Sequence, residues 1–256
     1  MKKIKKMTEP ALFSDFKANN PDSDWKKGFK KNAGAEANQA VNDKLKQEQY
    51  GLCVYCEIDL KSNRNQGLDD FRVEHFFPEN PKPDESRNDG INYALHWPNL
   101  FGCCSGGNVP HVIEKDTRYS NPHTHCDVPK SNNDWTNIIL NPILDIPAFP
   151  SLFKFSEDGE IFVSDECDTE IQVKVENTIK FLNLNTKKLQ RFRKEIITSL
   201  RQELISSNDI SETLDTLAKA NLLPNDNGNI SPFFTTIRWY LGDNAEDVLL
   251  HVNYDG

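Results

Sequence analysis

The sequence has no long apolar run, no internal repeat and no excess of positive charge. None of its hydrophobic stretches approaches the roughly 18 apolar residues that a membrane-spanning helix needs, so no membrane partner is expected. The basic residues 1–7 are followed by Thr-Glu-Pro and not by the apolar segment of a secretory signal. We therefore expect a cytoplasmic protein whose six cysteines are reduced.

The charge balance limits how the chain could meet a nucleic acid. Its 256 residues include 30 Lys and Arg against 39 Asp and Glu, a net charge of −9. Such a chain cannot coat DNA by bulk electrostatics, although a small basic site or a partner could still bring it to nucleic acid. Two lysine clusters, at residues 2–6 and 26–31, stand out, and the simplest interpretation of both is a solvated surface.

The composition divides the chain into three regions. Residues 1–50 are rich in lysine, and residues 35–50 predict a helix with an apolar stripe through Ala37, Val41 and Leu45. Residues 51–142 hold five of the six cysteines and five of the six histidines but few periodic segments. A bound metal is therefore the expected source of their order. Residues 143–256 predict a hairpin plus a helical scaffold or docking region, which makes the whole chain α+β.

The C-terminal region carries the clearest periodic patterns. Apolar and polar residues alternate at 153–155 and 161–163, on either side of a Glu-Asp-Gly-Glu turn, and predict the hairpin. After a polar start at residues 185–186, a helical stripe runs through Leu189, Phe192, Ile196, Leu200 and Leu204. A second helix is expected over residues 210–217, and a third from a Ser231-Pro232 cap to Gly242.

The cysteines of the middle region suit a metal site. Cys53 and Cys56 form a CxxC pair, whose spacing lets two thiolates face one ion. A redox function is disfavoured, because the polar residues 59–70 do not predict the long helix of a thioredoxin-like fold. Two further ligands would complete a zinc site. On the residues alone they stay open among three cysteines and three histidines: Cys103, Cys104, Cys126, His111, His123 and His125.

A second constellation lies between the two groups of cysteines. Glu74 and His75 adjoin at the end of a short apolar strand, just before a Pro turn. A carboxylate binds hard divalent cations and an imidazole deprotonates water near neutral pH, which together suit metal-assisted hydrolysis. Asn99 follows in Trp-Pro-Asn-Leu, and Asp127 and Lys130 come directly after Cys126. The alternative to a nuclease is a catalytically inactive module that zinc stabilises and that binds nucleic acid or protein. In that case the Glu-His pair would be structural.

The order of these motifs resembles that of the zinc-containing HNH endonucleases: CxxC, Glu-His with Pro, Asn-Leu, Cys, and then Cys-x-x-x-Lys. The resemblance implies a small ββα-metal core with flanking helices. It implies structural zinc on Cys53, Cys56, Cys104 and Cys126, and catalytic Mg²⁺ or Mn²⁺ on Glu74 and Asp127. It further implies His75 as general base and Asn99 as the residue that orients it. Asp127 stands where His or Asn is commoner, and phosphate contacts are implied for Lys130, with Arg72 and Arg118 as further candidates.

A narrower resemblance is to PtuB, the HNH component of Septu anti-phage systems that also occurs with some retrons. It is carried by Cys-Val-Tyr-Cys-Glu57, Val-Glu-His-Phe-Phe-Pro78, Trp-Pro-Asn-Leu100, Cys-Ser-Gly-Gly107 and His-Cys-Asp127. It implies a DNA or RNA substrate and a PtuA-like ATPase as partner. In retron systems it also implies a reverse transcriptase with its RNA–DNA product. The insert at residues 105–124, which separates the last two cysteines, is interpreted as a substrate loop or a tolerated insertion.

Overall fold

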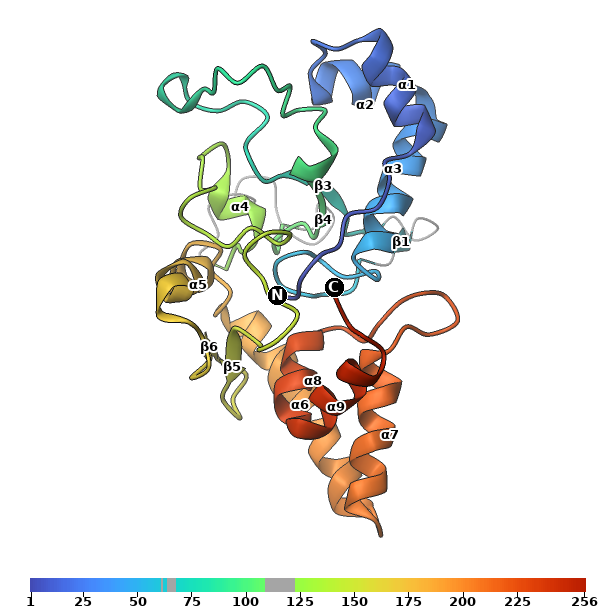
Figure 1. Cartoon of the computed structure of the whole chain (residues 1–256), viewed down its shortest axis with the longest axis vertical. Helices are drawn as coiled ribbons and strands as arrows, with labels where there is room; N and C mark the ends of the chain where they lie inside the picture. Colours follow the sequence, from blue (N-terminus) through green and yellow to red (C-terminus); the bar gives the residue numbers. More distant parts are fainter. Residues whose placement is uncertain (61, 64–67, 109–122) are drawn as a thin grey trace.

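The N-terminal region packs its aromatic side chains against the middle of the chain. The structure, a computed structural model, describes residues 1–60, 62–63, 68–108 and 123–256 (Figure 1). Its first elements are α1 (Ala11–Asn19), a π-helical turn (Trp25–Phe29), the short α2 (Lys30–Asn32) and α3 (Gly34–Glu48). The predicted stripe of α3 is confirmed, since Ala37, Val41 and Leu45 are buried in a cluster that also contains Trp97 and Leu100.

Two antiparallel strands lie at the centre of the molecule (Figure 1). In this pair, β3 (Arg72–His75) faces β4 (Leu100–Cys103), with His75 opposite Leu100 and Arg72 opposite Cys103. A 3₁₀ turn (Trp97–Asn99) leads directly into β4, and α4 (Asp127–Lys130) follows Cys126. The motifs that are separated along the chain therefore lie on two paired strands and a one-turn helix.

Part of the middle region differs from expectation or falls outside the described residues. Residues 59–70, which do not predict a helix, contain two short strands, and β1 (Ser62–Asn63) pairs antiparallel with β2 (Leu68–Asp69). A short 3₁₀ turn (Pro83–Glu85) lies in the long connection between β3 and β4. His111, Arg118 and most of the 105–124 insert lie outside the described residues.

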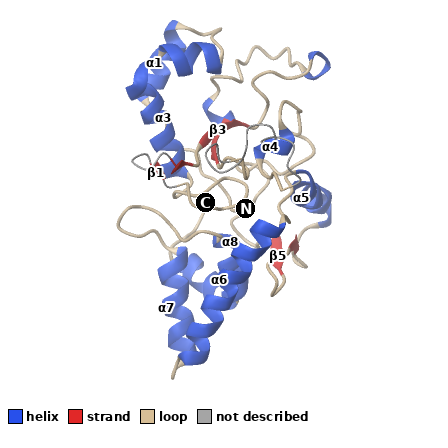
Figure 2. Cartoon of the chain, turned by 180° about the vertical axis from the view of Figure 1, so that it is seen from behind, coloured by secondary structure: helices blue, strands red, loops and turns tan. Residues whose placement is uncertain are grey.

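The C-terminal region contains the predicted hairpin and is otherwise helical. The hairpin pairs β5 (Phe153–Phe155) with β6 (Ile161–Val163), and the long helix α6 (Lys187–Ser206) is capped by the Thr186 side chain. The remaining helices are α5 (Thr169–Phe181), α7 (Ile210–Leu222), α8 (Phe234–Leu241) and α9 (Asp243–His251). Helices α6 to α9 form the half of the molecule farthest from α1 (Figure 2).

The start of α8 corrects the sequence-based prediction. The helix begins at Phe234, not at Pro232, because Phe233 adopts a left-handed conformation with φ of 60°. Glu57 holds this turn from the other region: its carbonyl accepts the Phe233 N–H at 2.9 Å, and its Oε2 accepts the Thr235 N–H at 2.9 Å. A carboxylate is a favourable partner for the free N–H groups at a helix start, so Glu57 replaces the expected Ser-Pro cap.

One hydrophobic core runs through all three composition regions. It contains Met1 and Ile4, the cysteines of the middle region, the β5–β6 hairpin and Phe233. The backbone also crosses between regions, since the Cys126 N–H donates to the Leu182 carbonyl at 2.9 Å. None of the helices in the described part of the chain combines the length and the apolar character that a membrane crossing needs.

Candidate active site

Four buried cysteine sulfurs come together behind the β3–β4 pair. The Sγ atoms of Cys53, Cys56, Cys104 and Cys126 all lie within 4.8 Å of one another. Neighbouring Sγ atoms are 3.7 Å apart for Cys56–Cys104 and Cys104–Cys126, and 3.8 Å for Cys53–Cys126. A tetrahedral ion with bonds of about 2.3 Å to sulfur spaces its ligands by about 3.8 Å, so this group could hold a metal such as zinc.

The neighbours of the cluster distinguish the competing ligands. Cys103 approaches the Cys53 Sγ at 3.8 Å, but its thiol also points to Asp127 Oδ1 at 3.6 Å, and it is not one of the four. His125 is buried with Nε2 3.8 Å from the Cys104 sulfur, whereas His123 is exposed. Burial raises the pKa of the Cys126 thiol, so a bound cation would be needed to stabilise its thiolate form.

The two predicted cation ligands are buried on the strand side of the cluster. Glu74, on β3, accepts hydrogen bonds through Oε1 from Lys130 Nζ at 2.9 Å and from the Tyr55 hydroxyl at 3.1 Å. Asp127, at the first position of α4, forms an ion pair with the Arg72 guanidinium. Burial and the negative charge of Glu74 raise the pKa of Asp127 to about 7. Two close, buried carboxylates are a donor set that fits a hard divalent cation.

Lys130 is buried and does not face solvent. Its side chain is 1% exposed, and Nζ donates both to Glu74 and to the His75 carbonyl at 2.8 Å. The ammonium therefore compensates the Glu74 charge and fixes the end of β3. The phosphate contact that the resemblance implies for this residue stays a prediction.

His75 ends β3 with one ring nitrogen fixed by the backbone. Its Nε2 lies 3.1 Å from the Ala94 carbonyl, which can only accept a hydrogen bond, so Nε2 carries the proton. In the neutral ring the lone pair is then on Nδ1. Burial lowers the pKa of the imidazole, which favours this neutral form. The Trp25 ring stands edge-on to the imidazole at 5.3 Å and restricts its rotation.

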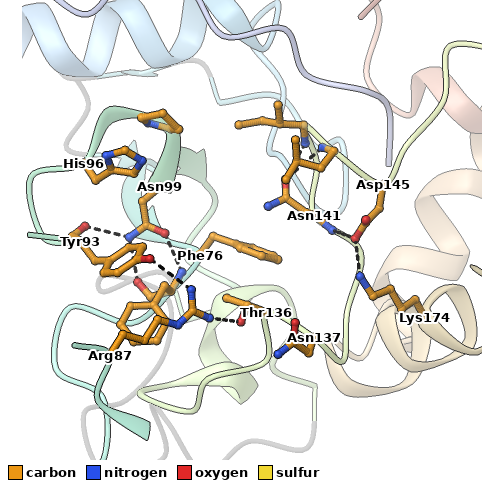
Figure 3. A pocket seen from close by; sticks show the side chains of 14 residues that line it. Phe76, Arg87, Tyr93, His96, Asn99, Thr136, Asn137, Asn141, Asp145 and Lys174 are labelled. Carbon is orange, nitrogen blue, oxygen red and sulfur yellow. Dashed lines mark hydrogen bonds and ion pairs between the residues drawn. The ribbon is translucent and has the colours of Figure 1, made fainter. Parts of the chain in front are cut away.

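Asn99 acts on this loop without touching the imidazole. Its Oδ1 accepts the Phe77 N–H at 2.7 Å, and its Nδ2 donates to the carbonyls of Phe77 at 2.9 Å and Tyr93 at 2.8 Å. Tyr93 precedes Ala94, whose carbonyl holds His75. Figure 3 shows this clamp on the wall of a separate pocket of about 380 Å³ that His75 does not line. The structure therefore brings Asn99 to the backbone that holds His75 and not to His75 itself.

His75 opens into another pocket of about 380 Å³, and lysines of the N-terminal region line it. Lys26, Lys30 and Arg72 supply its positive charge, and Trp25 and Glu79 complete the wall beside His75. The sequence-based interpretation treated residues 26–31 as a solvated surface and missed this placement. A run of lysines in an otherwise acidic chain was the feature of the sequence that could have indicated a basic binding surface.

The chain is similar to a bacterial protein over most of its length. It is 30% identical over 218 residues to a protein of Escherichia coli named "Retron Ec83 putative HNH endonuclease", covering 77% of this chain and 79% of the relative. No protein-family model matches the chain. The similarity spans most of both proteins, and the chain belongs to the HNH endonuclease family.

Proposed function

We propose that the chain is a divalent-metal-dependent nuclease with a ββα-metal core that hydrolyses phosphodiester bonds of nucleic acid. One observation carries the proposal: the neutral His75, held through Nε2, faces a pocket lined by cations and adjoins a pair of buried carboxylates. A base, a cation site and a positively charged substrate cavity at one point are what hydrolysis of a phosphodiester needs.

The chain's own residues account for the base-catalysed part of the reaction. His75 Nδ1 takes a proton from a water molecule, and the water oxygen attacks phosphorus while the bond to the 3′-oxygen breaks. The leaving 3′-oxygen takes a proton from solvent, so the products are a 5′-phosphate and a 3′-hydroxyl. The Ala94 carbonyl stabilises the imidazolium that forms, and Asn99 fixes that carbonyl through Tyr93. Arg72, which lines the same pocket, offers a positive charge to the phosphate.

Two metal sites have separate roles in this proposal. Cys53, Cys56, Cys104 and Cys126 would hold a structural zinc ion, away from the pocket. Glu74 and Asp127 would hold Mg²⁺ or Mn²⁺, which stabilises the negative charge that develops on the phosphate and the leaving oxygen. Asp127 then takes the third HNH position with an oxygen ligand, which suits a hard cation.

We further propose a PtuB-like role in a prokaryotic anti-phage complex. The name of the relative associates that protein with a retron, and the motifs of this chain resemble PtuB. The expected partners are a PtuA-like ATPase and, in a retron, the reverse transcriptase with its RNA–DNA product. The net charge of −9 supports a partner that brings the nuclease to its substrate.

The metal dependence of cleavage tests the function. In the purified complex, Glu74→Ala and Asp127→Ala should raise the Mg²⁺ or Mn²⁺ concentration needed for half-maximal cleavage, and excess metal should restore part of the activity. His75→Ala is the matched control, because excess metal cannot replace a general base. Cleavage that proceeds at the same rate with all divalent cations chelated, while the zinc content is unchanged, would exclude the proposed hydrolysis.

A further inference from the structure

Two lysines of the N-terminal region form one wall of the pocket into which His75 opens. Lys26 belongs to the π-helical turn and Lys30 begins α2, and both are exposed. They line the cavity together with Asn42 of α3 and Arg72 of β3. The fold thus joins the N-terminal region to the motif-bearing residues at the very point where the base lies.

The wall is held firmly in place. Trp25 is 8% exposed and packs against Phe29, with ring centroids 4.8 Å apart. The Asp24 carboxylate caps the turn by accepting the N–H groups of Lys27 and Gly28. Glu79, in the loop just after His75, accepts the Lys26 N–H at 3.0 Å. The two ammonium groups are therefore presented by a preorganised backbone tied to the His75 loop.

Among the described residues, no acidic side chain pairs with the two lysines of the wall. Within the described residues, neither Lys26 nor Lys30 has an ion pair or a side-chain hydrogen bond, although acidic residues outnumber basic ones overall. Glu79 is the one carboxylate among the described residues that line the pocket, and it is bonded to the backbone of the turn. Lysine contacts to phosphate supply the electrostatic part of nucleic-acid binding and fix its register.

We propose that Lys26 and Lys30 bind backbone phosphates of the nucleic-acid strand that enters the His75 pocket. This inference rests on the proposed nuclease function and deepens it, because it assigns substrate binding to a segment outside the HNH motifs. The contacts are to the phosphodiester backbone, a chemistry that DNA and RNA share, and they carry no sequence preference.

The salt dependence of binding tests this assignment with the full-length chain in its purified complex. The double variant Lys26→Gln/Lys30→Gln is compared with Lys27→Gln/Lys31→Gln, which removes the same charge from the same exposed segment but from residues that do not line the pocket. The probes are a labelled duplex DNA and a labelled single-stranded RNA, without added divalent cation. A plot of the logarithm of the binding constant against the logarithm of the salt concentration has a negative slope. The pocket variant should make this slope less steep by about 1.8 on the duplex, or about 1.4 on the single strand, between about 50 and 200 mM salt.

The outcomes separate this inference from the nuclease function. Equal slopes for the two double variants on both probes would overturn it, as would a wild-type complex that binds neither probe. The salt dependence could become less steep only for the pocket variant while the wild-type complex fails to cleave. That result would contradict the proposed hydrolysis but support the phosphate contacts. Where the complex cleaves, the pocket variant should raise KM and leave kcat unchanged. Both doubles should unfold at the wild-type temperature, because all four lysines are exposed.

Discussion

Each buried charge at the candidate site has a partner of opposite sign. Glu74 pairs with Lys130, and Asp127 pairs with Arg72. A buried pair adds little net stability compared with apolar residues, but removal of one partner leaves an uncompensated charge in a low dielectric. The pairs therefore place a cation beside each of the two carboxylates and make the site sensitive to any single change.

Replacement of Lys130 by Met should destabilise the fold. The change leaves Glu74 buried without its cation, and such a loss costs about 3–5 kcal/mol of unfolding free energy, measurable by urea denaturation. Lys82→Met is the control, because Lys82 is 56% exposed and lies 3.8 Å from Glu85, a surface pair worth at most about 1 kcal/mol. Similar losses in both variants would show that Lys130 is not an internal counter-ion.

Substitution of the cysteines should separate Cys104 from its neighbour Cys103. We expect about one zinc ion per wild-type chain, reduced in Cys104→Ser and retained in Cys103→Ser, because only Cys104 belongs to the group of four sulfurs. Elemental analysis measures this directly. Loss of zinc in Cys103→Ser with retention in Cys104→Ser would show that Cys103 is the ligand. Full zinc content in Cys104→Ser/Cys126→Ser would contradict the four-cysteine site.

Local patterns were enough to predict some elements and not others. The stripe of α3, the Thr186 cap of α6 and the β5–β6 hairpin depend on neighbours in sequence, and the structure contains them. The start of α8 depends on Glu57, 178 residues away, and no local pattern carries that information. The same reason hid Lys26 and Lys30: a run of lysines gives no sign of which distant residue it will face.

The turn of the hairpin shows how closely these elements pack. Gly159 has φ of +78°, and a Cβ added there would lie 2.1 Å from the Gln190 carbonyl of α6. Its own carbonyl accepts a hydrogen bond from the buried Arg193 at 3.2 Å. The hairpin can therefore approach α6 only because this residue has no side chain.

Gly159→Ala should accordingly lower the unfolding free energy more than Gly228→Ala does. Gly228 has a similar φ of +72° but no atom within 4 Å of the added Cβ, so it reports the backbone strain of about 1–2 kcal/mol alone. The clash at Gly159 should add about 1–3 kcal/mol. Chemical denaturation of the two variants gives the comparison, and equal losses would mean that the hairpin does not pack on α6 as described.

At the scale of the whole molecule, the regions cannot be tested by removing one of them. The Cys126 N–H is bonded to Leu182, and Glu57 holds the start of α8, so deletion from residue 174 onward would break contacts of the cysteine cluster. The proposal that the C-terminal region docks a partner needs surface substitutions instead. The place where α6 ends and α7 begins offers exposed apolar side chains, with Ile205 77% and Ile210 60% exposed.

Ile205→Asp/Ile210→Asp should therefore abolish co-purification with the PtuA-like ATPase, because it places charge on an apolar contact surface. Leu144→Asp is the control, since Leu144 is 79% exposed and precedes the C-terminal helices. Pull-down of the tagged partner measures the result. Unchanged co-purification by the double variant would move the interface away from this end of the molecule.

The most direct test of the account is cleavage by the complete complex with His75→Ala. His75 lies outside the cysteine cluster, so the variant should stay folded with its full zinc content, while cleavage should fall by about 10²–10⁴-fold with the loss of the base. His96→Ala, a half-buried histidine that does not line the His75 pocket, should cleave at the wild-type rate. Cleavage by His75→Ala at the wild-type rate would contradict the mechanism and make the Glu-His pair structural.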